Sequence, residues 1–143
     1  MTHEETVFDK ILAGDIPCHR LYEDDHVLAF LDIGPLSYGH CLVIPKERQA
    51  QLHKLSDEAG AAIGRVLPRL CRAVMKATGA ASYNILQNNG RPAHQEVMHV
   101  HFHIIPKFDD AGLGILWPAR KLETSDAVEL TRKIRTALDA EAS

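Results

Sequence analysis

The stretch V-M-H-V-H-F-H-I-I-P, residues 97–106, is the most informative part of the sequence. Histidine occupies three alternate positions in it, His99, His101 and His103, and the positions between them are apolar. Successive side chains of a β-strand point to opposite faces of the sheet. A strand over 97–106 would therefore carry three imidazoles on one face and apolar groups on the other. Packing alone explains this pattern poorly, because the wet face of an ordinary strand holds Thr, Lys, Glu or Ser.

The composition indicates one globular domain spanning residues 1–143. The chain is 45% hydrophobic and 24% charged, and its 143 residues are enough for one core of ordinary size. A formal net charge of −3 argues against a general nucleic-acid-binding protein, which normally carries a basic stripe. We expect no membrane partner either, because no apolar run is long enough to span a bilayer and the N-terminus lacks a signal-peptide core.

The three cysteines indicate neither a disulfide framework nor a zinc ribbon. Cys18, Cys41 and Cys71 are odd in number, widely spaced and without a C-x-x-C pair. Cys41 and Cys71 lie among apolar residues, so we expect them to be buried as small hydrophobic side chains. Such a set of cysteines is typical of a reducing cytoplasm, where we place the protein.

The hydrophobic periodicity predicts helices and strands in an order that favours an α+β domain. A long helix is expected to begin after Ser56 and to end at Gly79, and Pro68 should kink or divide it. Apart from the one that contains this helix, the connections between the predicted elements are too short for parallel crossovers, which suggests a mainly antiparallel sheet. The other predicted elements are helices over 7–12 and from about Ser125, and strands at Tyr22, 27–31, 41–44, 83–87 and 97–106.

Three interpretations of the alternating histidines compete at this point. They could be surface or core residues without a function, although three in register make that a weak explanation. They could bind a metal ion, but a straight strand keeps His99 and His103 about 13 Å apart, too far to share one ion. They could also act on a phosphate, because a neutral imidazole is a good nucleophile and an imidazolium donates to phosphoryl oxygens.

The third interpretation is supported by a family resemblance that covers most of the chain. The motif His99-Val-His101-Phe-His103-Ile-Ile resembles the H-x-H-x-H-x-x motif of the histidine-triad (HIT) nucleotide hydrolases and transferases. Further segments stand where that family has similar ones: Phe8-Asp-Lys-Ile11, Ile16-Pro17, Tyr22-Glu-Asp-Asp, Ala29-Phe-Leu-Asp32-Ile33, Gly39-His40-Cys-Leu-Val-Ile-Pro45-Lys46 and Asn88-Asn-Gly90.

The resemblance implies a HIT-like fold, with a five-stranded antiparallel sheet that is usually extended across a homodimer. It also implies a purine nucleotide substrate, no cofactor and a two-step reaction. His101 would attack the α-phosphorus, and water would then hydrolyse the nucleotidyl-histidine. His103 and His40 would hold phosphoryl oxygens, and the backbone carbonyl of His99 would orient His101.

The same resemblance implies a nucleotide-binding set around these histidines. Asp32 would bind the ribose, since a carboxylate accepts from both hydroxyls, although simple turn chemistry before Gly34-Pro35 is an alternative explanation for it. The base would be walled by apolar side chains, and a loop would reach the ribose-phosphate side; these residues are Phe8, Ile11, Phe30, Ile33, Asn88, Gln95, Glu96 and Val97.

Two features place the chain near the Hint branch of the family, whose usual activity is on purine nucleoside phosphoramidates. His103 stands where transferases of the family carry Gln, which favours hydrolysis. The segment from Gly112 to Trp117 also resembles that branch, and Trp117 either packs locally or reaches a dimer partner. The alternatives are hydrolysis of dinucleoside polyphosphates, as in the Fhit-like branch, and a nucleotide-binding sensor or scaffold with vestigial activity.

The chain also departs from the family pattern at two places. His94-Gln95-Glu96 replaces a Gly-Gln-Ser or Gly-Gln-Thr sequence, which removes a hydroxyl and adds a carboxylate near the leaving group. We favour a solvent-facing His94 over a fifth imidazole at the phosphate. Some relatives bind structural zinc through an N-terminal C-x-x-C pair and a nearby His; those places hold residues around Thr6 and Asp9, and Arg48, so we expect no metal.

Overall fold

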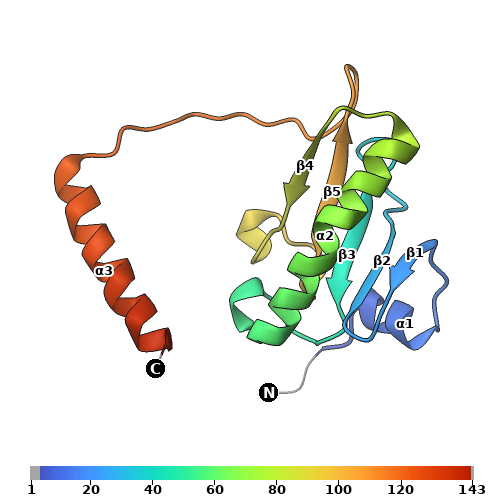
Figure 1. The fold of residues 1–143 in the computed structure, drawn as a ribbon, viewed down its shortest axis with the longest axis horizontal. Helices are drawn as coiled ribbons and strands as arrows, with labels where there is room; N and C mark the ends of the chain where they lie inside the picture. The colour runs from blue at the N-terminus through green and yellow to red at the C-terminus, as the bar shows by residue number, and fades with distance from the viewer. Residues whose placement is uncertain (1–3, 143) are drawn as a thin grey trace. The chain divides into compact units, whose positions relative to one another are not determined.

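The computed structural model describes residues 4–142, which divide into two compact units, one up to Leu113 and one from Gly114 onward. The first unit contains a five-stranded sheet of order β1-β2-β3-β5-β4 (Figure 1). Every neighbouring pair is antiparallel, so the predicted α+β fold with a five-stranded antiparallel sheet is confirmed. The strands are β1 Arg20–Glu23, β2 Val27–Leu31, β3 Cys41–Pro45, β4 Ser82–Leu86 and β5 Phe102–Lys107.

Two helices of this unit begin and end at residues that cap them. In α1, Val7–Ala13, the side chains of Thr6 and Asp9 form a capping box with each other's backbone N–H groups. The long helix α2, Asp57–Thr78, begins at Ser56, whose hydroxyl accepts from Ala59, and ends at Gly79 in the left-handed conformation, as predicted. Short 3₁₀ turns lie at Leu52–Lys54 and Arg91–Ala93.

The prediction that Pro68 could divide the long helix is wrong, because α2 is continuous across it. Proline removes one backbone hydrogen bond from a helix interior. Buried residues on both sides of Pro68, among them Ile63, Val66 and Leu70, hold the helix against the sheet, and packing of this kind is the main source of helix stability in a folded protein.

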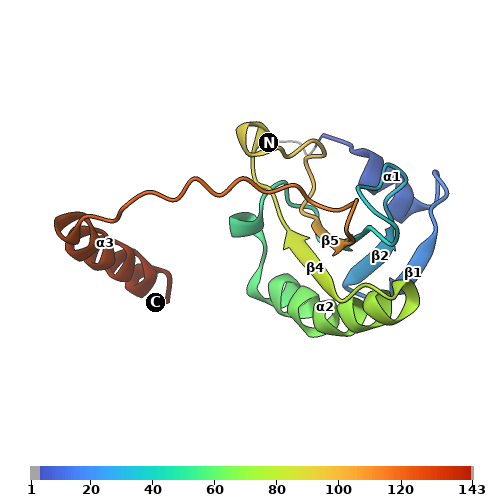
Figure 2. The same cartoon turned by 90° about the horizontal axis from the view of Figure 1, so that it is seen from above.

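The two faces of the sheet carry separate apolar cores, with α2 on one side and α1 on the other (Figure 2). Strand alternation sends Val27, Ala29, Cys41, Val43 and Ile104 to the α2 face. It sends Leu28, Phe30, Leu42 and Ile44 to the α1 face, where Phe8 and Ile11 cover them. Cys41 and Cys71 are buried in the first of these cores, as expected.

The histidine stretch differs from the single strand predicted over 97–106. Strand β5 begins at Phe102, so His103 lies in the strand, His101 directly precedes it and His99 lies in a bend. The bend is local, since the N–H of His99 donates to the carbonyl of Val97 at 2.9 Å. The ladder between β3 and β5 covers Cys41–Val43 only, and the carbonyl of Pro45 accepts from the ring of His99 instead of from a strand.

The second unit contains an irregular segment, 114–123, followed by α3, Thr124–Ala142, which confirms the helix expected from about Ser125. Its apolar residues are largely exposed, including Leu130, Ile134 and Leu138 of α3, and Trp117 is 83% exposed. None of the helices in the described residues is both long and apolar enough to cross a membrane.

Candidate functional site

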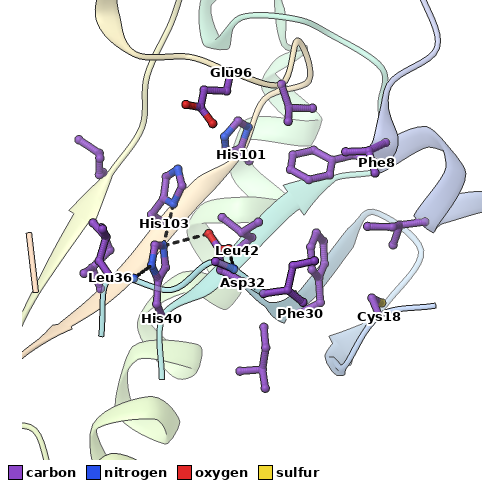
Figure 3. A pocket seen from close by; sticks show the side chains of 18 of the residues that line it. Phe8, Cys18, Phe30, Asp32, Leu36, His40, Leu42, Glu96, His101 and His103 are labelled. Atoms are coloured by element: carbon purple, nitrogen blue, oxygen red, sulfur yellow. Dashed lines mark hydrogen bonds and ion pairs between the residues drawn. The ribbon is translucent and has the colours of Figure 1, made fainter. Parts of the chain in front are cut away.

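A cavity of about 520 Å³ opens on the α1 face of the sheet and contains most of the residues predicted for the site (Figure 3). Histidines and Asp32 line one part of it, and apolar side chains from α1, β2 and β3 line the other. The full lining is Val7, Phe8, Ile11, Ile16, Pro17, Cys18, Phe30, Leu31, Asp32, Ile33, Gly34, Leu36, His40, Leu42, Leu86, Asn88, His94, Glu96, Val97, His101, His103 and Ile105.

The hydrogen bond of His101 fixes which of its ring nitrogens can act as a nucleophile. Nδ1 lies 2.7 Å from the backbone oxygen of His99. A carbonyl oxygen can only accept, so Nδ1 carries the proton and donates it. Nε2 of the neutral ring therefore has a free lone pair. The ring is 6% exposed and stands edge-on to Phe8, with 5.1 Å between centroids.

The same reasoning fixes the protons of His40 and His103. The backbone N–H of Leu36 donates to Nδ1 of His40 at 3.0 Å, so the neutral ring of His40 carries its proton on Nε2. Nε2 lies 2.9 Å from Nδ1 of His103, which must accept. His103 is left with an N–H at Nε2, directed away from His40 (Figure 3). Of these three buried histidines, His101 thus presents an imidazole lone pair and His103 presents an imidazole donor.

Close packing places His40 at the start of β3. Gly39 adopts a φ of +91°, and a Cβ atom there would lie 2.5 Å from Cγ2 of Thr78 at the end of α2. Glycine is the residue that adopts this conformation without a steric cost. The position of His40 therefore depends on the close approach of α2 to the turn before β3.

Burial favours the neutral forms of three histidines of the cavity, His40, His101 and His103. It lowers the pKa of His101 below the usual 6.5, against smaller opposing effects of the bond to His99 and of Asp32. It also lowers the pKa of His40, while Asp32 raises it. The pKa of His103 falls to about 4, because burial is reinforced by the neighbouring His101 and His40. At neutral pH the ring of His101 is therefore uncharged and keeps its lone pair on Nε2.

Asp32 is held by the turn that follows β2 and by His40. Oδ1 accepts from the N–H of Gly34 at 2.8 Å, and Oδ2 lies 3.4 Å from Nε2 of His40. The turn chemistry foreseen for Asp32 is thus present, and its carboxylate still lines the cavity, where further lone pairs can accept from a ligand. Among residues 4–142, Asp32, His40 and His103 also form a group whose potential metal-ligand atoms lie within 4.8 Å of one another.

His99 lies outside this cavity, in a buried polar cluster. Its Nε2 donates to the carbonyl of Pro45 at 2.8 Å, and its Nδ1 lies 3.9 Å from Oδ1 of Asp9. Asp9 is 2% exposed and pairs with Nε of Arg48 at 3.2 Å. Asp9 and Arg48 of this cluster stand where, by the family resemblance, some relatives carry zinc ligands. Through the carbonyl of His99, the cluster supports the orientation of His101.

The apolar part of the cavity has the residues predicted to contact a base. Phe8 and Phe30 pack edge to face, with 5.7 Å between ring centroids, and Ile11 lies beside them. Ile33 also lines the cavity but is 91% exposed, so it forms part of the rim. These groups form an apolar wall of the kind that binds planar rings.

The loop before His99 divides into lining and supporting residues. Asn88, Glu96 and Val97 line the cavity, whereas Gln95 is buried and does not. The side-chain oxygen of Gln95 accepts from Gly90, and its amide donates to the carbonyls of Ala50 and Val97. Gln95 therefore holds the loop in shape. His94 is exposed, as favoured from the sequence, and lies at the cavity rim with a φ of 70°.

Several lining residues were missed by the sequence reasoning, notably Cys18 and Leu42. Leu42 could have been found from strand parity, because it stands two residues after His40 and so points to the same face. Cys18 follows Pro17 in an irregular segment, and no periodic signal relates it to β2. The buried role of Asp9 had one signal, its place three residues after Thr6 in a capping box.

Comparison with known proteins agrees with this geometry. The model of the HIT domain family matches residues 13–110. Adenosine 5'-monophosphoramidase hnt1 of Schizosaccharomyces pombe is 52% identical over 133 residues, which cover 92% of this chain and 97% of that protein. Adenylylsulfatase HINT3 of Arabidopsis thaliana is 40% identical over 97% of this chain and 64% of its own length.

A solved structure extends the likeness to three dimensions. The histidine triad nucleotide-binding protein from Candida albicans is 40% identical and superimposes with a TM-score of 0.86, over 97% of this chain and 100% of that one. Family match, identity and fold agree along most of the sequence. The chain therefore belongs to the HIT domain family, as a Hint-like member.

Proposed function

We propose that this protein hydrolyses the phosphorus–nitrogen bond of purine nucleoside phosphoramidates, of the AMP-amine or AMP-lysine type, through a covalent nucleotidyl-histidine on His101. One observation carries the proposal: the bond from Nδ1 of His101 to the carbonyl of His99 leaves the Nε2 lone pair free beside the cavity. The names of relatives support it, since the matched protein of S. pombe is an adenosine 5'-monophosphoramidase.

The reaction has two balanced steps. In the first, the Nε2 lone pair of His101 forms a bond to the α-phosphorus, and the P–N bond to the amine breaks. The amine nitrogen keeps that electron pair, takes one proton from solvent and leaves as a neutral amine. In the second step, a water oxygen bonds to the phosphorus, the bond to His101 breaks and one proton returns to solvent. The net reaction consumes one water and releases the nucleoside monophosphate.

The other predicted residues have roles around this step. The Nε2–H of His103 donates to a phosphoryl oxygen. His40 was expected to hold a phosphoryl oxygen too, but its ring nitrogens bond to the N–H of Leu36 and to His103; we therefore propose that His40 holds His103 in that state instead. Asp32 accepts from the ribose hydroxyls. Phe8, Ile11, Phe30 and Ile33 contact the base, while Asn88 and the backbone up to Val97 reach the ribose-phosphate side. No metal and no cofactor enter either step.

The test is turnover of adenosine 5'-phosphoramidate and AMP-lysine by the purified chain, compared with diadenosine polyphosphates under the same conditions. Faster release of AMP from the phosphoramidates is expected. A preference for the polyphosphates would favour the Fhit-like activity. Binding of AMP at micromolar concentration without turnover of any substrate would favour a nucleotide sensor and overturn the enzymatic proposal.

We also propose that residues 1–143 act as a single HIT domain that forms a homodimer in the cytoplasm. Support for the dimer comes from the second unit, where Leu116 and Trp117 are 93% and 83% exposed and the apolar face of α3 is open. Support for the compartment comes from the free thiols of Cys18, Cys41 and Cys71. Light scattering of the full chain should give twice the monomer mass of 15.9 kDa.

A further inference from the structure

Glu96 stands between two cavities. It lines the catalytic cavity together with His101 and His103, and its carboxylate extends toward the ring of His101 (Figure 3). It also lines a second cavity of about 210 Å³ that shares Val7 and Val97 with the first. A group attached to a phosphorus beside His101 therefore has space to extend past Glu96 into the second cavity.

The carboxylate of Glu96 is not committed to the fold. In the part of the chain that the structure describes, its side chain makes no hydrogen bond and no ion pair, and it is exposed. Asp32, the other carboxylate of the catalytic cavity, differs because it makes both a hydrogen bond and an ion pair within the protein. It is held by the N–H of Gly34 and by His40. Glu96 is thus the carboxylate of the cavity whose oxygens can meet a ligand without losing a protein partner.

The second cavity has an excess of negative charge. Glu4, Glu5 and Glu96 contribute three carboxylates to its lining, and Arg91 contributes one guanidinium. The remaining lining residues, Thr6, Val7, Val97 and Met98, are uncharged. Charges a few ångströms apart at a protein surface still interact measurably, and the interaction weakens as salt is added. An ammonium group in this space is attracted, and a carboxylate or sulfate is repelled.

We propose that Glu96 selects the leaving group by charge: the site favours amines that carry a second, cationic group and disfavours anionic leaving groups. The inference rests on the proposed hydrolase function and specifies its substrate class, which is phosphoramidates of diamines or of lysine-like amines. It also separates this chain's expected preference from the activity named for its relative HINT3, an adenylylsulfatase, whose leaving group is an anion.

The experiment uses three AMP phosphoramidates whose amines have a four-carbon chain and differ in the terminal group: ammonium, hydroxyl or carboxylate. The measured quantity is the ratio of kcat/KM for the cationic substrate to that for the anionic one. We expect a ratio of about ten or more for the unchanged chain at low salt, which falls as salt rises. Glu96→Gln should lower the ratio several-fold, while Glu4 and Glu5 retain a weaker preference, and Glu96→Asp should keep more of the preference than Glu96→Gln.

Glu58→Gln is the matched control, because Glu58 is a largely exposed carboxylate on α2, against the opposite face of the sheet. It should leave the ratio unchanged. Turnover of all three substrates with the same ratio in the unchanged chain and in Glu96→Gln would overturn the inference and leave the proposed function standing. Absence of turnover for all three substrates would overturn the proposed function and the inference with it.

Discussion

On the α2 face of the sheet, Val43 and Ile104 pack with Ile63 and other side chains of α2 into an apolar core. On the α1 face, by contrast, Leu42 stands opposite His103 and the core opens into a cavity. The same strands supply both faces, with side chains that alternate between them. The core described on the α2 face is built from apolar side chains, whereas the α1 face also buries His101, His99 and Asp9. Burial on the first face stabilises the fold, and burial on the second also sets the protonation of the reactive groups.

The largest expected difference between the two faces is in enzymatic turnover. His101→Ala should reduce phosphoramidate turnover by about a thousandfold or more, because it removes the proposed nucleophile, and should leave AMP binding largely intact. Ile63→Ala is the counterpart on the other face; it should destabilise the protein by about 2 to 5 kcal/mol and leave turnover per folded molecule unchanged. Activity assays combined with urea unfolding compare the two. Unchanged turnover in His101→Ala would remove the proposed nucleophile.

A second substitution tests whether the polar cluster of the α1 face also supports the fold. Asp9→Ala removes the capping box with Thr6 and the partner of Arg48, and leaves His99 without the neighbouring carboxylate. We expect a loss of about 2 to 4 kcal/mol in unfolding free energy. Asp25→Ala, at an exposed turn, is the control and should change stability by less than about 0.5 kcal/mol. Equal stability of the two variants would contradict the role given to the cluster.

The pH dependence of turnover is expected to be a smaller effect. Because the pKa of His101 is lowered from 6.5, its neutral form persists as the pH falls to that value, and protonation removes the lone pair only below it. The kcat/KM profile should therefore be flat from pH 8 to about 6.5, with the acid limb below. Substrate hydrolysis without enzyme must be subtracted at each pH. An acid limb above pH 6.5 would show that the ring is not desolvated as described.

Removal of metal ions should leave turnover unchanged. Asp32, His40 and His103 are close enough to share an ion, but the ring atoms involved already bond to each other at 2.9 Å. Turnover measured with and without EDTA is expected to be equal. A loss with EDTA that zinc restores would reassign these residues to a metal site.

The pattern of apolar residues and the capping residues allowed much of the fold and the site to be predicted. The apolar runs at 27–31 and 41–44 gave β2 and β3 to within a residue, and capping residues located both ends of α2. The place of His99 was harder to foresee. Three alternating histidines predicted one strand with three imidazoles on one face. The ladder between β3 and β5 ends at Val43, however, and the ring of His99 donates to the carbonyl of Pro45 in the interior.

The sequence by itself indicated the family and the groups that we propose for the chemistry, because the alternation of histidines and the segments around them limit both fold and reaction. The tertiary structure decided how those groups differ. A proton on Nδ1 of His101, a donor on His103 and a pKa of about 4 for that ring follow from backbone carbonyls, backbone N–H groups and burial supplied by distant residues. Side-chain protonation depends on neighbours in space, and the order of residues along the chain does not specify them.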